Sequence, residues 1–129
     1  MDISETMVTP QAAIHWFEIR CADLERATAF YETPLRTQLT RTKFGDPMAI
    51  FPYGNGGTGG ALVKRKMQRP GPTGTLVYLN CNGKLDEVIA RVPGVGGLVL
   101  MPKTEIEDGH GHFARIRDSE GNHVGLHSV

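Results

Sequence analysis

The stretch FEIRCADLERATAFY, residues 17–31, decides the fold, because a similar stretch, VYLNCNGKLDEVIARV, follows at residues 77–92. Each begins with an apolar, strand-like run that ends near a cysteine, Cys21 or Cys81, and continues through a polar break into a helical pattern. In both patterns apolar residues recur at i, i+3, i+4 and i+7, as one face of an amphipathic helix requires. The chain therefore contains a duplicated strand–helix unit.

Each unit is followed by the same kind of segment, a strand, a turn and another strand. These segments are AIFPYGNGGTGGALV in the first half and HFARIRDSEGNHVGLH in the second. The order strand, helix, strand, strand, strand thus occurs twice, and it predicts an α+β fold of two modules, at about 11–66 and 73–129. Residues 1–10 are expected to form a loose tail. Two copies of one module can face each other across a cavity, so a site should use equivalent strands of both.

Two boundaries follow from local signals. Asp23 can cap a helix that starts at Leu24 and includes an acidic residue in its first turn, and Pro34 is expected to end it near Glu32. The fifth strand is expected over residues 75–80.

The composition excludes several classes of protein. The 129 residues suit one domain, and fourteen basic against fourteen acidic residues give a formal net charge of zero. No basic run longer than Lys64–Lys66 is present, which argues against nucleic acid as a partner. The apolar runs are too short for a membrane span, and the N-terminus lacks the pattern of a signal peptide. Two cysteines without an export signal predict reduced thiols in the cytoplasm.

Two short motifs suggest chemistry, but their context does not support it. Residues 54–59, GNGGTG, match the dinucleotide pattern G-x-G-x-x-G, yet a strand-like run follows instead of the required helix. We interpret this segment as a hairpin loop. His110 and His112 would face the same side of a strand, but no further metal ligand is near them in sequence.

Strand alternation is more informative for the site. In the first strand, Phe17 and Ile19 form the apolar face, which leaves Trp16, Glu18 and Arg20 on the opposite face.

In the last strand, Val124 and Leu126 should pack under the helix, and His123, Gly125 and His127 should lie on the opposite face. If these two opposite faces line one cavity, Glu18 with His123 or His127 could supply an acid/base pair. The alternative is that these are ordinary polar residues at a cavity rim.

The stretches FEIRCADLERATAFYET, GGTGGALV and DSEGNHVGLHS resemble the vicinal oxygen chelate superfamily, which includes glyoxalase I, extradiol dioxygenases, and fosfomycin- and bleomycin-resistance proteins. The resemblance covers about residues 13–128. It implies paired βαβββ modules, a curled mixed sheet around a cavity, and assembly as a homodimer. Metal-dependent members hold a divalent ion through His, Gln or Glu on the first and last strands of the modules.

The resemblance places those ligand positions on Trp16, Val63, Thr75 and Gly125. None of these side chains is a good ligand for a divalent ion. We therefore expect neither the usual metal nor another cofactor, and we expect a small organic ligand to contact the cavity-lining residues Trp16, Arg20, Val63, Thr75, Val77 and Gly125.

Three functions remain open at this level. The chain could be a metal-free binding protein, with Trp16 as an aromatic platform. It could be a lyase- or isomerase-type enzyme that uses Glu18 as base and His123 or His127 as acid, with or without a shifted metal site. It could also be an interaction module whose cavity is filled by side chains.

Overall fold

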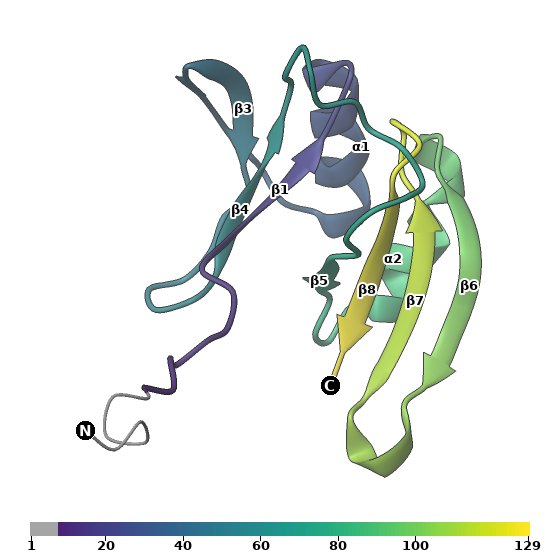
Figure 1. Ribbon diagram of the computed structural model, residues 1–129. Helices are drawn as coiled ribbons and strands as arrows, with labels where there is room; N and C mark the ends of the chain where they lie inside the picture. The colour runs from purple at the N-terminus through teal and green to yellow at the C-terminus, as the bar shows by residue number, and fades with distance from the viewer. Residues whose placement is uncertain (1–7) are drawn as a thin grey trace.

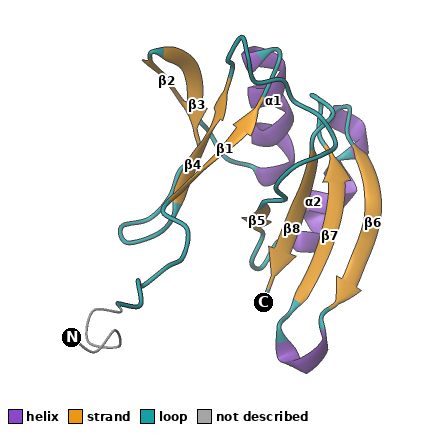
Figure 2. Cartoon of the chain, in the orientation of Figure 1, coloured by secondary structure: helices purple, strands orange, loops and turns teal. Residues whose placement is uncertain are grey.

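The computed structural model describes residues 8–129, which form two four-stranded sheets and two α-helices (Figures 1 and 2). The first module contains β1 (Trp16–Arg20), α1 (Leu24–Leu35), β2 (Thr40–Phe44), β3 (Asp46–Ile50) and β4 (Gly59–Val63). The second contains β5 (Tyr78–Asn80), α2 (Leu85–Arg91), β6 (Leu98–Glu105), β7 (His112–Arg117) and β8 (His123–Ser128), with single 3-10 turns η2 (Pro93–Val95) and η3 (Glu107–Gly109). Most of the expected N-terminal tail, residues 1–7, lies outside the described part of the chain.

The two modules have the same topology, which confirms the α+β fold expected from the duplication. The strand orders are β1-β4-β3-β2 and β5-β8-β7-β6, and in each sheet only the first pair is parallel. The cysteines occupy equivalent places: the Cys21 N–H donates to the Val63 carbonyl (3.1 Å) and the Cys81 N–H to the His127 carbonyl (2.7 Å). The sheets remain separate and do not close into one barrel. The limits of the modules, at 11–66 and 73–129, remain predictions.

One hydrophobic core serves both modules. Helix α1 packs on β3 and β4, α2 packs on β6 and β8, and the two helices contact each other. Buried residues of both halves meet there, among them Ile19, Tyr31, Leu79, Val88 and Leu126. The packing of these buried side chains therefore joins the two modules into one contiguous core.

Both cysteines are free and belong to this core. Burial raises the pKa of Cys21 and of Cys81 to about 11, so both are uncharged thiols at neutral pH. They are structural residues, as the pattern of the duplicated units suggests.

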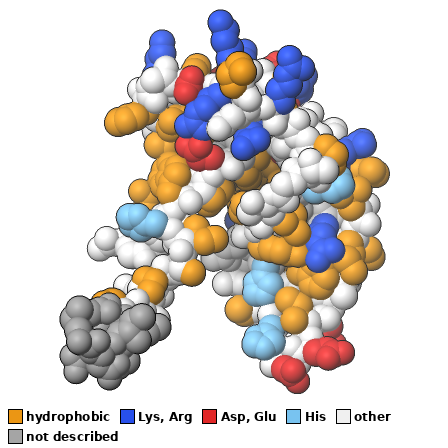
Figure 3. Space-filling view, in the orientation of Figure 1, with side chains coloured by type: hydrophobic (Ala, Val, Ile, Leu, Met, Phe, Trp, Pro, Cys, Tyr) orange, Lys and Arg blue, Asp and Glu red, His pale blue; other side chains and the backbone are white. Residues whose placement is uncertain are grey.

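The strand faces are arranged as the alternation predicts. Ile19 of β1 is buried toward α1, whereas Trp16, Glu18 and Arg20 are exposed on the side away from the helix. In β8, Val124 and Leu126 are buried in the core. The helix-distal faces of the two sheets flank the hollow visible in Figure 3.

Two boundaries differ from the expectation. Helix α1 continues through Pro34 to Leu35, because a proline in the last turn removes only one terminal hydrogen bond, and Arg36, with φ 50°, closes the helix through its N–H. Strand β5 begins at Tyr78, not Thr75. Upstream of Val77, whose carbonyl still accepts from the Gly125 N–H (2.8 Å), the chain leaves the ladder and becomes part of the linker between the modules.

No helix in residues 8–129 is long and apolar enough to cross a membrane.

Candidate functional site

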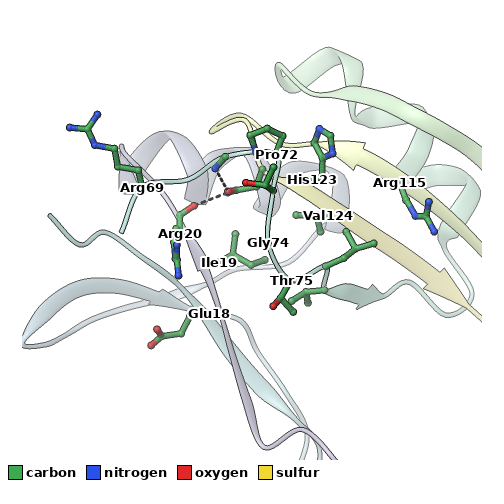
Figure 4. A pocket seen from close by; sticks show the side chains of 15 residues that line it. Glu18, Ile19, Arg20, Arg69, Pro72, Gly74, Thr75, Arg115, His123 and Val124 are labelled. Atoms are coloured by element: carbon green, nitrogen blue, oxygen red, sulfur yellow. Dashed lines mark hydrogen bonds between the residues drawn. The ribbon is translucent and has the colours of Figure 1, made fainter. Parts of the chain in front are cut away.

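A pocket of about 500 Å³ lies between the modules. Strand β1 contributes Glu18 and Arg20, the linker contributes Arg69 and residues 71–77, and the second module contributes Arg115 and His123 (Figure 4). The linker passes from the end of β4 toward β8 and then turns to β5, so it forms one wall (Figure 1). We call this space the inter-module pocket.

Asn122 holds the walls of the inter-module pocket together. Its Nδ2 donates to the Arg20 carbonyl (2.7 Å) and to Asp118 Oδ2 (2.9 Å), and its Oδ1 accepts from the Gly71 N–H (3.0 Å). One side chain thus joins β1, the linker and the turn between β7 and β8. The position of Arg20 relative to the linker depends on these bonds.

The rest of that turn joins the modules through two acidic side chains. Asp118 is 2% exposed and accepts from the Tyr31 hydroxyl of α1 (2.6 Å) and from two N–H groups of its own turn, those of Glu120 and Asn122 (both 2.9 Å). Burial raises the pKa of Tyr31 well above its usual value, so its hydroxyl stays protonated and donates. We call residues 118–122 the inter-module clamp.

Glu120 of the clamp caps the N-terminal end of α1 from the other module. Its Oε1 accepts from the N–H groups of Ala22 and Asp23 (both 2.9 Å), and both of its oxygens accept from the Arg26 guanidinium. Burial works against the charged form, but hydrogen bonds from Arg26, Asp23, Ser119 and Ala22 outweigh it and lower the Glu120 pKa to about 2. The carboxylate is therefore charged at neutral pH, where it also complements the helix dipole.

Glu18 lines the inter-module pocket but is already paired. Both of its oxygens accept from the Arg65 guanidinium, one of them at 3.1 Å. These hydrogen bonds lower the Glu18 pKa, with a further contribution from the charge of Arg20. A carboxylate held in its charged form by arginine is a weak proton acceptor, so the geometry gives no support to Glu18 as a general base.

The structure separates the two expected histidines. His123 lines the inter-module pocket together with Glu18. His127 lies in a second pocket, of about 670 Å³, with Tyr78 and Phe113, and its Nε2 is 2.8 Å from the His110 carbonyl oxygen. Only Glu18 and His123 therefore share a cavity.

Three of the expected ligand contacts, Arg20, Thr75 and Val77, line the inter-module pocket. The other three lie elsewhere on the helix-distal faces. Trp16 is 41% exposed and stands edge-on to Tyr53, with ring centroids 6.2 Å apart. Val63 is buried in a small cluster with Met48 and Ala61.

Gly125 is covered by the ring of Tyr78, and a Cβ at this position would collide with that ring. The residue therefore offers a ligand neither a side chain nor open access.

The family's metal positions were expected on Trp16, Val63, Thr75 and Gly125. The register pairs Trp16 with Gly59, Val63 with Arg20, and Gly125 with Tyr78. Indole, aliphatic and glycine positions provide no donor, and within residues 8–129 no three His, Cys, Asp or Glu side chains gather as a metal-binding group. The donor set does not fit a divalent ion, so we derive no chemical step from one.

The glycine-rich segment is a loop, as expected. It leads into β4, which begins at Gly59, and no helix follows to hold a pyrophosphate.

Sequence reasoning missed Arg69, Arg115 and the clamp. The alternation of the strand that contains Arg115 could have indicated its face, because this residue lies two positions after Phe113. Nothing local marks Arg69. The sequence DSEGN was visible as a turn, but its partners Ala22, Arg26 and Tyr31 are about a hundred residues away and only the fold brings them together.

Comparisons with known proteins agree with this architecture. The family model described as "Glyoxalase/Bleomycin resistance protein/Dioxygenase superfamily" matches residues 13–126. None of the curated proteins compared with this chain matches it.

Among solved structures, a hypothetical protein of S. aureus superposes with a TM-score of 0.69 at 22% identity, covering 93% of this chain and 96% of the other. A glyoxalase-related enzyme from Fulvimarina pelagi gives 0.69 at 16% identity (93% and 89%). A fosfomycin resistance protein, FosX, from Listeria monocytogenes gives 0.66 at 16% identity (92% and 91%). At these identities the structural likeness shows the fold alone.

Proposed function

Since the chain belongs to the glyoxalase/bleomycin resistance protein/dioxygenase superfamily, we propose that it binds a small organic ligand in the inter-module pocket, without the divalent ion typical of the family. The observation that carries the proposal is the composition of the pocket wall, where both modules and the linker place polar side chains around one space of about 500 Å³. Pockets of this size with a few convergent polar groups are typical of small-molecule sites.

The rigid surroundings of the pocket support this proposal. Asn122 fixes the linker against β1, and the clamp fixes β8 against α1, so the walls are arranged before a ligand arrives. A preformed site saves the free energy of ordering its walls on binding. The alternative is an interaction module whose cavity is filled by side chains. The open space of about 500 Å³ argues against it.

Backbone-amide NMR of metal-free protein tests the proposal. A panel of neutral and anionic aromatic fragments is expected to shift the amide signals of Ile19, Thr75 and Val124, which line the inter-module pocket. The variant Thr75→Trp should abolish these shifts, because an indole at this exposed linker position fills the pocket.

Thr42→Trp, at an exposed site on β2 outside the pocket, is the matched control and should leave the shifts unchanged. The proposal fails if no fragment shifts the pocket amides, or if the shifts gather at Asn82 and Ile106 around the second pocket.

A lyase- or isomerase-type reaction is a weaker second candidate. It is favoured by one observation, that Glu18 and His123 line the same pocket. Since Arg65 holds Glu18 in its charged form, His123 is the better candidate for proton transfer. If the parent chain has a lyase or isomerase activity, its survival in Glu18→Gln and its loss in His123→Gln would support His123 as the proton-transfer residue. Equal loss of that activity in both variants would contradict this assignment.

We also propose that the protein forms a homodimer and functions in the cytoplasm. Support for the dimer comes from large apolar side chains exposed at the two sheets, Trp16, Tyr78, Leu98 and Leu100, each 41–46% exposed. Light scattering should give twice the mass of one chain, and a monomer mass at micromolar concentration would contradict the dimer.

A further inference from the structure

We propose that the inter-module pocket selects ligands that carry an anionic oxygen group, a carboxylate or a phosphonate, and that Arg20 is the main recognition residue. The inference rests on the proposed function, because it names the ligand class of the same pocket. It follows from the charges that line the pocket and from the partners of these charged groups.

The charged side chains of the pocket do not balance. Arg20, Arg69 and Arg115 line it, and Glu18 is the only acidic residue among the lining residues. Glu18 is already paired with Arg65, which itself lies outside the lining. The pocket therefore has three positive side chains and one carboxylate, which is hydrogen-bonded to Arg65 and interacts with Arg20 only through its charge. A concave site lined by one sign of charge concentrates its field and attracts the opposite charge.

Arg20 and Arg69 are the pocket guanidinium groups with free donors. Across residues 8–129 neither side chain makes a hydrogen bond or ion pair, and the Arg20 carbonyl accepts from Asn122. The Cα of Arg20 is held on β1 opposite Val63, whereas Arg69 lies on the linker, so Arg20 is the better positioned of the two. Figure 4 shows its side chain on the same side of β1 as that of Glu18. Five N–H donors in a planar fork match the geometry of a carboxylate or phosphonate.

Arg115 occupies the other side of the pocket in a fixed position. Its Nε donates to the Tyr78 hydroxyl (3.0 Å), and its guanidinium carbon lies 5.1 Å from the centre of the Phe113 ring. These contacts use one N–H and leave the two terminal nitrogens free. Arg115 therefore adds positive charge at a defined place on the wall of the inter-module pocket, while its aromatic partners Tyr78 and Phe113 line the second pocket.

The linker adds neutral donors to the same wall. Thr73, Gly74 and Thr75 line the pocket, and within the described chain their N–H groups have no hydrogen-bond partner. The side chains of Thr73 and Thr75 add two hydroxyl groups to this wall. Backbone N–H groups next to arginine are a common combination for oxyanion binding.

Three probes of similar size test the inference: phenylphosphonate, benzoate and neutral benzamide, each titrated into the full chain and followed by amide shifts of the pocket residues. Both anions are expected to bind at least about tenfold more tightly than benzamide, because charge-assisted hydrogen bonds are roughly twice as strong as neutral ones. Raising the salt concentration should weaken the binding of the two anions and leave the binding of benzamide unchanged.

Arg20→Gln should reduce the affinity for phenylphosphonate about tenfold. Arg117→Gln is the matched control, since Arg117 is exposed on β7 two residues beyond Arg115 but does not line the pocket. Within residues 8–129 the Arg20 side chain has no hydrogen-bond or ion-pair partner, so Arg20→Gln is expected to fold like the parent, and its amide spectrum verifies that.

The outcomes separate the two proposals. If benzamide binds in the pocket as tightly as the anions, or if Arg20→Gln and Arg117→Gln have equal affinity for phenylphosphonate, the anionic preference is overturned while the ligand pocket stands. If none of the three probes shifts the pocket amides, both proposals are overturned. Stronger binding of phenylphosphonate than benzoate would assign the preference to a dianionic group, and the reverse order would assign it to a carboxylate.

Discussion

Replacing Asp118 with alanine is expected to lower the free energy of unfolding by about 3–5 kcal/mol, because each buried donor left without a partner costs about 1–3 kcal/mol. Asp118 is 2% exposed, and the change removes the acceptor of the fully buried Tyr31 hydroxyl and of two N–H groups in the turn. It also releases the Asn122 side chain that orients the linker. Urea unfolding followed by circular dichroism measures the loss.

Two variants show whether this loss comes from the buried network. Tyr31→Phe removes one hydrogen bond and should cost about 1–2 kcal/mol. Its effect should not add to that of Asp118→Ala, since the two residues share the bond. Asp86→Ala removes an exposed pair with Lys103 and should cost less than about 1 kcal/mol. A loss for Asp118→Ala no larger than that for Asp86→Ala would show that the clamp does not hold the modules together.

Glu120 is expected to make the free energy of unfolding decrease as the pH becomes acidic. Its pKa is about 2 in the folded protein, below the ordinary value of 4.5. A carboxyl group with a lowered pKa binds fewer protons when folded, so its contribution is complete above pH 4.5 and is lost as the pH falls toward 2. The variant Glu120→Gln should therefore be less stable at neutral pH, by about 2 kcal/mol, and should lose less stability than the parent between pH 4.5 and 2.

The loss of stability at acid pH should not disappear entirely in Glu120→Gln, because the pKa values of Glu18 and Glu25 are also lowered by their arginine partners. Glu87→Gln, on the exposed face of α2, is the matched control and should leave the profile unchanged. Thermal melts at a series of pH values measure both variants. Parallel profiles for the parent and Glu120→Gln would contradict the assignment of Glu120 as a charged cap of α1.

The sequence was sufficient for the fold because the signals that encode it are local. Amphipathic spacing places both helices, and strand alternation correctly assigns Ile19 and Val124 to the core. The same alternation places Glu18 and His123 on the outer faces, where they do line one pocket. These patterns require only neighbouring residues, which is why a single sequence reveals them.

What the sequence could not provide is the result of long-range pairing. The register that puts Arg20 opposite Val63 depends on two strands separated by about forty residues. The partner of Glu18 is Arg65, which lies 47 residues away in the chain, and this pair changes the chemistry expected of Glu18. Likewise, the clamp joins DSEGN to residues of α1 that no local pattern connects with it.

The structure therefore suggests a division of roles within one fold. The clamp and the shared core hold two repeated modules at a fixed separation, and the linker and the arginines give the space between them its chemistry. At the positions where the sequence resemblance places the ligands of metal-dependent members, this chain has residues that pack, such as Trp16 against Tyr53 and Gly125 under Tyr78. We propose that the site functions through arginines and hydrogen-bond donors without a bound divalent ion.

The metal content of protein purified without a histidine tag tests this claim most directly. We predict that nickel, zinc, manganese and iron are all substoichiometric and that the double variant Glu18→Ala, His123→Ala, at the two residues that share the inter-module pocket, contains no less of any of them than the parent. One equivalent of a divalent metal per chain in the parent, lost in that double variant, would contradict the claim and would place a shifted metal site on those two residues.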